Sequence, residues 1–160
     1  IYSHFSTKKK LVEASTFYVL EKVNETICSI IDANYDPIEE TFTIKSMINN
    51  LLKNEKSSPS YQLQKYYPKI YNTLKQKQFT LIQELIKENL AKGIQQKLYR
   101  KEIDTDFIAR IYFNGMVGIK NKDLFPLVNY SMNTLTSYHL EYHLRGISTA
   151  KGIKELEKQL

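Results

Sequence analysis

The chain has 160 residues, of which 42% are hydrophobic and 25% are charged, with a formal net charge of +6. This balance is typical of one soluble globular domain and excludes a disordered chain, and no apolar run approaches the roughly 18 residues of a transmembrane helix. The single cysteine, Cys28, excludes an intrachain disulfide framework and any zinc site built on several cysteines, and favours a cytoplasmic protein.

Helices are the elements that the sequence predicts, because apolar residues recur three and four apart and only five glycines and four prolines interrupt them. The first helix should cover residues 8–32, with Ser6 or Thr7 as its cap. A second helix should begin at Asp36 and Pro37. Further expected elements are a loop over 54–59, a short helix over 60–66 and a long helix over about 69–99.

The second half of the chain predicts three more helices, so that the fold class is an all-α bundle of about six or seven helices. Asp104 should cap a helix over 105–117, with Gly118 as its end. Asp123 should cap the next helix, which has Pro126 in its first turn and is expected to run to Arg145 and stop at Gly146. Ser148 should cap a final helix that ends near Leu160.

Three consecutive lysines, Lys8, Lys9 and Lys10, occupy the first turn of the first predicted helix. The helix dipole favours acids at this position by about 0.3–1 kcal/mol each, so local stability does not explain the lysines. They would suit binding of an anion near the helix N-terminus. The alternative is an ordinary solvated lysine run.

The opening residues resemble the junction between head and body in tetracycline-repressor-type (TetR/AcrR) regulators. In that family the DNA-recognition helix ends in Tyr-x-(His/Tyr)-Phe, followed by a small polar cap, a lysine, usually two acids and a leucine. The matching residues are Tyr2, His4, Phe5, Thr7, Lys8 and Leu11. Lys9 and Lys10 depart from the pattern, since acids are common there. Stretches 63–68 and 142–152 also resemble members of the family.

This resemblance implies a bundle of the TetR C-terminal domain type, with the end of a helix-turn-helix DNA-binding head at 1–7 and a ligand-sensing and dimerisation domain at 8–160. It implies a homodimer formed by the helices 105–117 and 123–145, and a repressor that releases operator DNA when a small molecule binds. Because the chain opens at Ile1 rather than Met, we expect the rest of the head upstream. Tyr2, His4 and Lys8 would contact DNA phosphates, so this chain should bind DNA weakly and without selectivity.

Aromatic residues are abundant, with 12 tyrosines and 7 phenylalanines, and could line a cavity for an amphipathic or aromatic ligand. Ordinary core packing is the alternative for each of them. Nearby amides at Gln78, Asn89 and Asn114 could orient the ligand. The predicted ligand-binding residues are Tyr61, Tyr67, Tyr71, Phe79, Tyr112, Phe113 and Met116.

Other chemistry is weakly supported, and we expect neither an enzyme nor a cofactor. His139 and His143 are one helical turn apart and could bind a metal, but no third ligand is evident, and an ordinary helix surface is the favoured interpretation. Cys28 is expected to be a small buried hydrophobe. Two rival functions remain open: a helical protein-interaction module without a small-molecule ligand, and a metal-dependent helical enzyme.

Overall fold

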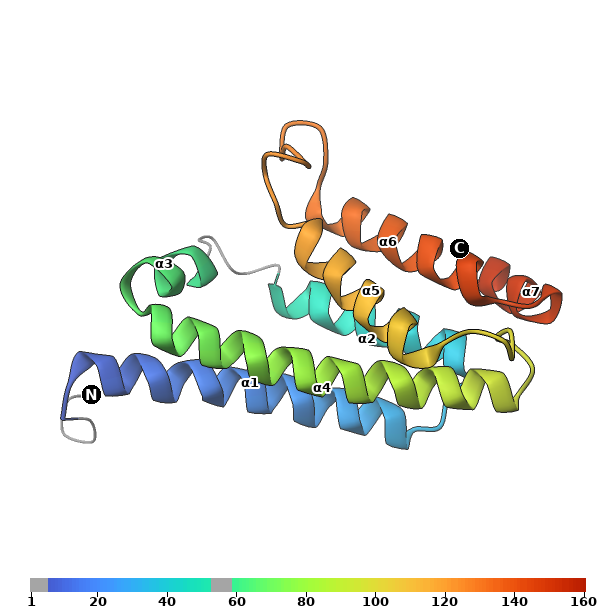
Figure 1. Cartoon of the computed structure of the whole chain (residues 1–160), viewed down its shortest axis with the longest axis horizontal. Coiled ribbons are helices and arrows are strands. Elements are labelled where there is room, and N and C mark those ends of the chain that lie inside the picture. The colour runs from blue at the N-terminus through green and yellow to red at the C-terminus, as the bar shows by residue number, and fades with distance from the viewer. Residues whose placement is uncertain (1–5, 53–58) are drawn as a thin grey trace.

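The computed structural model describes residues 6–52 and 59–160, and within those ranges the chain is entirely helical apart from turns and one isolated bridge. This confirms the predicted all-α fold. Tyr2 and His4, and the core of the predicted loop over 54–59, lie outside the described residues. The helices are α1 (Lys8–Asp32), α2 (Pro37–Leu52), α3 (Pro59–Tyr66), α4 (Pro68–Gln95), α5 (Thr105–Gly118), α6 (Met132–Ile147) and α7 (Ala150–Gln159) (Figure 1).

The predicted caps at the starts of three helices are confirmed. Thr7 accepts a hydrogen bond from the backbone N–H of Lys10 at 3.2 Å, which fixes the start of α1. Asp36 accepts from the N–H groups of Ile38 and Glu39, and Asp104 accepts from that of Phe107. Each side chain satisfies an N–H group that the first helical turn leaves without a partner.

The long helix α4 ends four residues earlier than the sequence predicts. Lys97 takes a φ of +60°, in the left-handed region, and so breaks the helix. The carbonyl of Gly93 then accepts from the N–H groups of both Leu98 and Tyr99, at 2.8 and 3.0 Å. Gly93 is required here because an added Cβ would lie 1.9 Å from the ring of Tyr99. The reversal therefore folds Tyr99 back onto α4.

The predicted helix over 123–145 is wrong at both ends. Residues 119–131 form turns, in which the N–H of Asp123 donates to the Asn121 side chain, and Asp123 caps nothing. Ser131 is the actual cap of α6, accepting from the N–H of Thr134 at 3.0 Å. The helix continues through Gly146 to Ile147.

The last helix is capped one residue later than predicted. Thr149, not Ser148, accepts from the N–H of Gly152 at 3.1 Å. Cys28 is also exposed on α1 rather than buried. Its apolar neighbours Ile27 and Ile30 lie at other angles around the helix, and Ile27 is the one that is buried.

The two long helices α1 and α4 lie side by side along the length of the molecule, with α2 behind them (Figure 1). The starts of α1 and α4 and the whole of α3 share one end, and α7 lies toward the other. Helices α5 and α6 form an antiparallel pair, of which α5 packs on α4. None of the described helices is long and apolar enough to cross a membrane.

The core lies where α2, α4, α6, α7 and the connection after α4 meet. Its buried side chains are Ile38, Leu90, Leu98, Tyr99, Leu140, Leu144, Ile147 and Leu156. A polar network crosses this core: the hydroxyl of Tyr99 donates to Asn89, whose amide donates to Glu40 and to the carbonyl of Pro37. Both ends of the Asn89 amide thus form hydrogen bonds within the protein core. Asn89 therefore stabilises the fold, and these bonds do not support the suggested role in orienting a ligand.

Candidate ligand seam and dimerisation face

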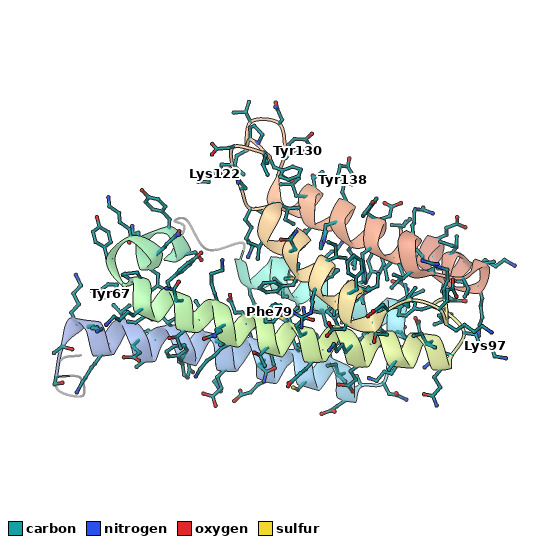
Figure 2. The ribbon with its side chains drawn as sticks, in the orientation of Figure 1. Tyr67, Phe79, Lys97, Lys122, Tyr130 and Tyr138 are labelled. Atoms are coloured by element: carbon teal, nitrogen blue, oxygen red, sulfur yellow. The ribbon has the colours of Figure 1, made fainter. Side chains whose placement is uncertain are left out.

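The seven predicted ligand-binding residues fall into two separate groups. Tyr61, Tyr67 and Tyr71 lie on α3 and at the start of α4, whereas Phe79, Tyr112, Phe113 and Met116 lie on the middle of α4 and on α5. Figure 2 labels one residue of each group, Tyr67 and Phe79. Twelve residues of helix separate these two, which corresponds to about 18 Å along the axis. The two groups therefore lie at different positions along α4.

Two members of the second group, Phe79 and Phe113, meet at the contact between α4 and α5, which we call the α4–α5 seam. The rings of Phe79 and Phe113 meet edge to face, with centroids 5.1 Å apart. The guanidinium of Arg110 lies over the Phe79 ring at 5.6 Å. Asp106 pairs with Lys87 at 2.5 Å and with Arg110 at 2.7 Å, and these hydrogen bonds, that of Lys87 first, lower the pKa of its carboxyl. The Asp106 carboxylate thus pairs with both cations at the rim of the seam and offsets one of their two positive charges.

Gln83 is a residue of the seam that the sequence reasoning missed. It lies four residues after Phe79 and four before Lys87, so all three share one face of α4, and the contacts of the other two turn this face toward α5. Gln83 is 7% exposed, and neither its amide nitrogen nor its oxygen has a hydrogen-bond partner in the described structure. A buried amide without a partner lowers the stability of the folded protein by about 1–3 kcal/mol, unless a ligand forms hydrogen bonds with it. In the sequence, the only indication of this position is that a polar residue interrupts the apolar stripe of the long helix.

On another side of α5, about 100° around the helix from Phe113, Tyr112 packs against two histidines of α6. Its ring centroid lies 4.7 Å from that of His139 and 4.5 Å from that of His143. Gly115 leaves room for His139, because an added Cβ would lie 2.2 Å from its Nε2. The interpretation of both histidines as ordinary surface residues is therefore wrong, since this face of α6 is covered by α5.

Burial determines the charge state of this cluster. It lowers the pKa of His139, lowers that of His143 to about 4 and raises that of Tyr112 to about 12. All three side chains are therefore neutral near pH 7. The described residues contain no group of three or more potential metal-binding side chains.

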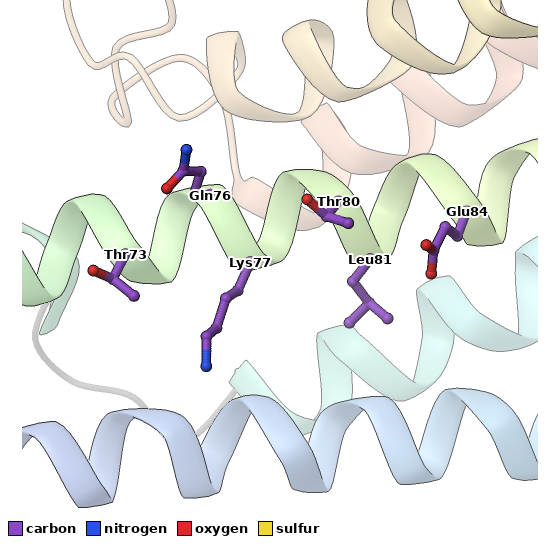
Figure 3. A pocket seen from close by; sticks show the side chains of 6 residues that line it. All are labelled: Thr73, Gln76, Lys77, Thr80, Leu81 and Glu84. Atoms are coloured by element: carbon purple, nitrogen blue, oxygen red, sulfur yellow. The ribbon is translucent and has the colours of Figure 1, made fainter.

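Two open grooves lie in the described part of the molecule, and neither is lined by any of the seven predicted residues. One, of about 450 Å³, follows the polar surface of α4 and ends at Glu84 (Figure 3). The other, of about 530 Å³, lies between α2, α6 and the end of the chain, beside Phe42 and Tyr138. Both are surface grooves rather than enclosed apolar cavities.

Helices α5 and α6 carry exposed apolar side chains on the side turned away from the core, which we call the α5–α6 outer face. Phe107 and Ile111, four residues apart on α5, are about half exposed, and Tyr138 and Tyr142 on α6 are 63% and 83% exposed. Figure 2 labels Tyr138. The residues two positions further on, which point the opposite way, are buried: Ala109, Leu140 and Leu144. Clusters of exposed apolar side chains are typical of interaction sites.

No protein-family model and no curated protein sequence matches this chain. Among solved structures, the chain is similar to the ketosteroid transcriptional regulator KstR2 of Mycobacterium tuberculosis, with a TM-score of 0.57 and 16% sequence identity. The match covers 92% of this chain and 76% of that one. KstR2 is a regulator of the TetR family. The chain therefore has the fold of a TetR-type regulator, as the resemblance of its sequence predicted.

Proposed function

We propose that this chain is the sensor and dimerisation domain of a TetR-type transcriptional repressor that acts in the cytoplasm. The observation that carries the proposal is the shared fold over 92% of the chain. In the proposed arrangement, residues 1–7 end a DNA-binding head, Tyr2, His4 and Lys8 contact phosphates, and residues 8–160 form the sensor. The protein has a binding function and no catalytic one.

The α5–α6 outer face supports a homodimer. Phe107, Ile111, Tyr138 and Tyr142 provide aromatic and aliphatic surface on two adjacent antiparallel helices, and a two-fold axis would pair these with the same helices of a second copy. Tyrosine and phenylalanine are enriched in the cores of such interfaces. A stable interface of this type buries at least about 1,000 Å² in total.

Sedimentation equilibrium of the 160-residue chain tests the dimer. Replacing Ile111 with lysine places a charge in the interface, and we expect the dissociation constant to rise at least about 100-fold. Val19→Lys is the matched control, because Val19 is equally exposed but lies on α1. A monomeric parent chain, or equal weakening by the two variants, would contradict the proposal.

The α4–α5 seam supports the ligand site. Phe79 and Phe113 offer aromatic surface, Tyr112 and Met116 lie on the same helix as Phe113, and the unpartnered amide of Gln83 offers both a donor and an acceptor. The seam therefore suits a neutral, amphipathic small molecule that enters by separating α5 from α4.

Ligand binding would act on DNA affinity by shifting a population of conformations. Helix α4 contacts α1, and the ammonium of Lys77 lies 4.6 Å from the centroid of the Phe17 ring, so a displacement of α4 reaches the helix that begins at Lys8. The two heads of the dimer would then no longer match half-sites about 34 Å apart. A coupling of about 1–3 kcal/mol is typical of such regulation.

Fluorescence titration with the neutral dye Nile red tests the seam. We expect Gln83→Leu to weaken dye binding, while Gln95→Leu, at the exposed end of the same helix, leaves it unchanged. A helical interaction module without a ligand is the second candidate, and it is favoured by the observation that neither open groove includes the predicted ligand residues. Absence of any saturable Nile red binding would support that module and contradict the sensor.

A further inference from the structure

The net charge of the chain is concentrated at one end of the molecule. The first halves of α1 and α4, together with α3, contain seven lysines and a single acid, Glu13. The remaining sixteen basic and sixteen acidic residues of the chain cancel, so this part accounts for the whole net charge of +6. We call it the basic end; its lysines are Lys8, Lys9, Lys10, Lys65, Lys69, Lys75 and Lys77.

The fold brings these lysines together although they are distant in sequence. The start of α1, all of α3 and the start of α4 lie at the same end of the molecule (Figure 1). Lys77 on α4 lies over Phe17 of α1, which ties the two helices together there. All seven lysines except the half-buried Lys75 are exposed.

None of the seven forms a salt bridge with a described acid, whereas Lys22, Lys87 and Lys92 elsewhere each do. The first turn of α1 also contains no acid to offset its three lysines. Seven ammonium groups that repel one another, three of which oppose the dipole of α1, do not stabilise this fold. Their arrangement is explained by an anionic partner.

The chemistry of the basic end favours an extended polyanion over a single small anion. Its ammonium groups are spread over an open surface, and Lys69 and Lys77 are about 12 Å apart along α4. Duplex DNA carries about seven phosphate charges over that length of its axis. Tyrosines alternate with the lysines, as where Lys65 lies over the ring of Tyr66, and their hydroxyls can donate to phosphates. The exposed large hydrophobic residues of α3 are tyrosines rather than the aliphatic residues of a membrane-surface helix.

We propose that the basic end binds the phosphate backbone of duplex DNA without sequence preference. Lysines of α3 and α4 would thereby add contacts to any that a separate head makes. The inference goes beyond the proposed function, because it assigns DNA contacts to the body of the sensor. The 160-residue chain alone is sufficient to test it, and the outcome does not depend on the dimer and ligand experiments.

The test measures binding of a short fluorescein-labelled duplex of arbitrary sequence by fluorescence anisotropy, at salt concentrations from about 25 to about 150 mM. The variant replaces Lys65, Lys69 and Lys77 with glutamine. We expect the slope of log affinity against log salt to become shallower by up to about 3, since each lost phosphate contact removes about 0.9. Affinity at the lowest salt should fall at least about tenfold.

The matched control replaces Lys101, Lys154 and Lys158 with glutamine, which lowers the net charge equally but away from the basic end. It should keep the parent slope. Equal loss in both triple variants would show a general effect of net charge and overturn the proposal. It would also be overturned if the chain bound vesicles of phosphatidylserine, or single-stranded RNA, through the same lysines but did not bind duplex DNA. Circular dichroism of each variant excludes unfolding as the cause.

Discussion

Acidification should destabilise the protein through the buried histidine cluster of α6. His143 has a pKa of about 4 in the folded chain against an ordinary value of 6.5. Because the folded state holds the lower pKa, the unfolded state binds the proton first as pH falls. Above pH 6.5 the imidazole is neutral in both states and has no effect, so the stability is lost between about pH 6.5 and about pH 4.

The size of the loss follows from the pKa difference. Each pH unit within the window is worth about 1.4 kcal/mol, so His143 should lower the free energy of unfolding by about 2 kcal/mol at pH 5. The loss should level off near 3 kcal/mol below pH 4. His139 shifts in the same direction and adds to it. Opposing charges do not compensate: Tyr112 is neutral, Asp106 and Arg110 pair on the α4 side, and Glu141 pairs with Arg145.

Urea unfolding at pH 7.5 and pH 5, at one protein concentration, measures this loss. His143→Phe keeps an aromatic ring against Tyr112 and should reduce the difference between the two pH values by about 2 kcal/mol. Tyr142→Phe, the neighbouring exposed residue of α6, should behave as the parent chain. If His143→Phe kept the full parental difference, His143 would not be buried in its neutral form and the reasoning would be refuted.

Three further substitutions test the packing. Gly93→Ala should destabilise the chain by more than about 2 kcal/mol in urea unfolding, because its Cβ would collide with Tyr99. Gly146→Ala is the control: no atom lies within 4 Å of the added Cβ, so this variant should be neutral or stabilising by up to about 1 kcal/mol. Equal effects of the two variants would contradict the assigned packing. Tyr99→Phe should cost about 1–3 kcal/mol by leaving the Asn89 oxygen without its donor, and an unchanged midpoint would show that water replaces it. In the absence of ligand, Gln83→Leu should raise the melting temperature, since it removes an unpartnered buried amide; a loss of stability would mean that the amide has a partner in the folded chain.

Local signals in the sequence predicted much of the fold. The caps Thr7, Asp36 and Asp104 are confirmed. They could be predicted because the side-chain oxygen of a cap accepts a hydrogen bond from a backbone N–H only two or three residues further along the chain. The end of α4 was missed because Tyr99 turns back onto Gly93 to reach Asn89, and this is a tertiary contact. Asp123 resembles a cap as well as Ser131 does, and only the packing of α6 on α5 decides between them.

The candidate site was less predictable for the same reason. Aromatic content indicated ligand-binding residues, but not that Phe79 meets Phe113 while Tyr112 packs against α6. His139 and His143 look like surface residues on an isolated helix, and only Tyr112 from α5 shows that they are buried. The lysines at the start of α1 were evident in the sequence, whereas their proximity to those of α3 and α4 required the fold.

The central claim is that this chain serves a sequence-specific DNA-binding protein. The most direct measurement selects bound duplexes from a random pool with the protein expressed from its complete reading frame. The account predicts a two-fold symmetric sequence with half-sites about one helical turn apart, bound at least about 10³-fold more tightly than random DNA. Recovery of no preferred sequence, with binding that follows salt concentration alone, would contradict it.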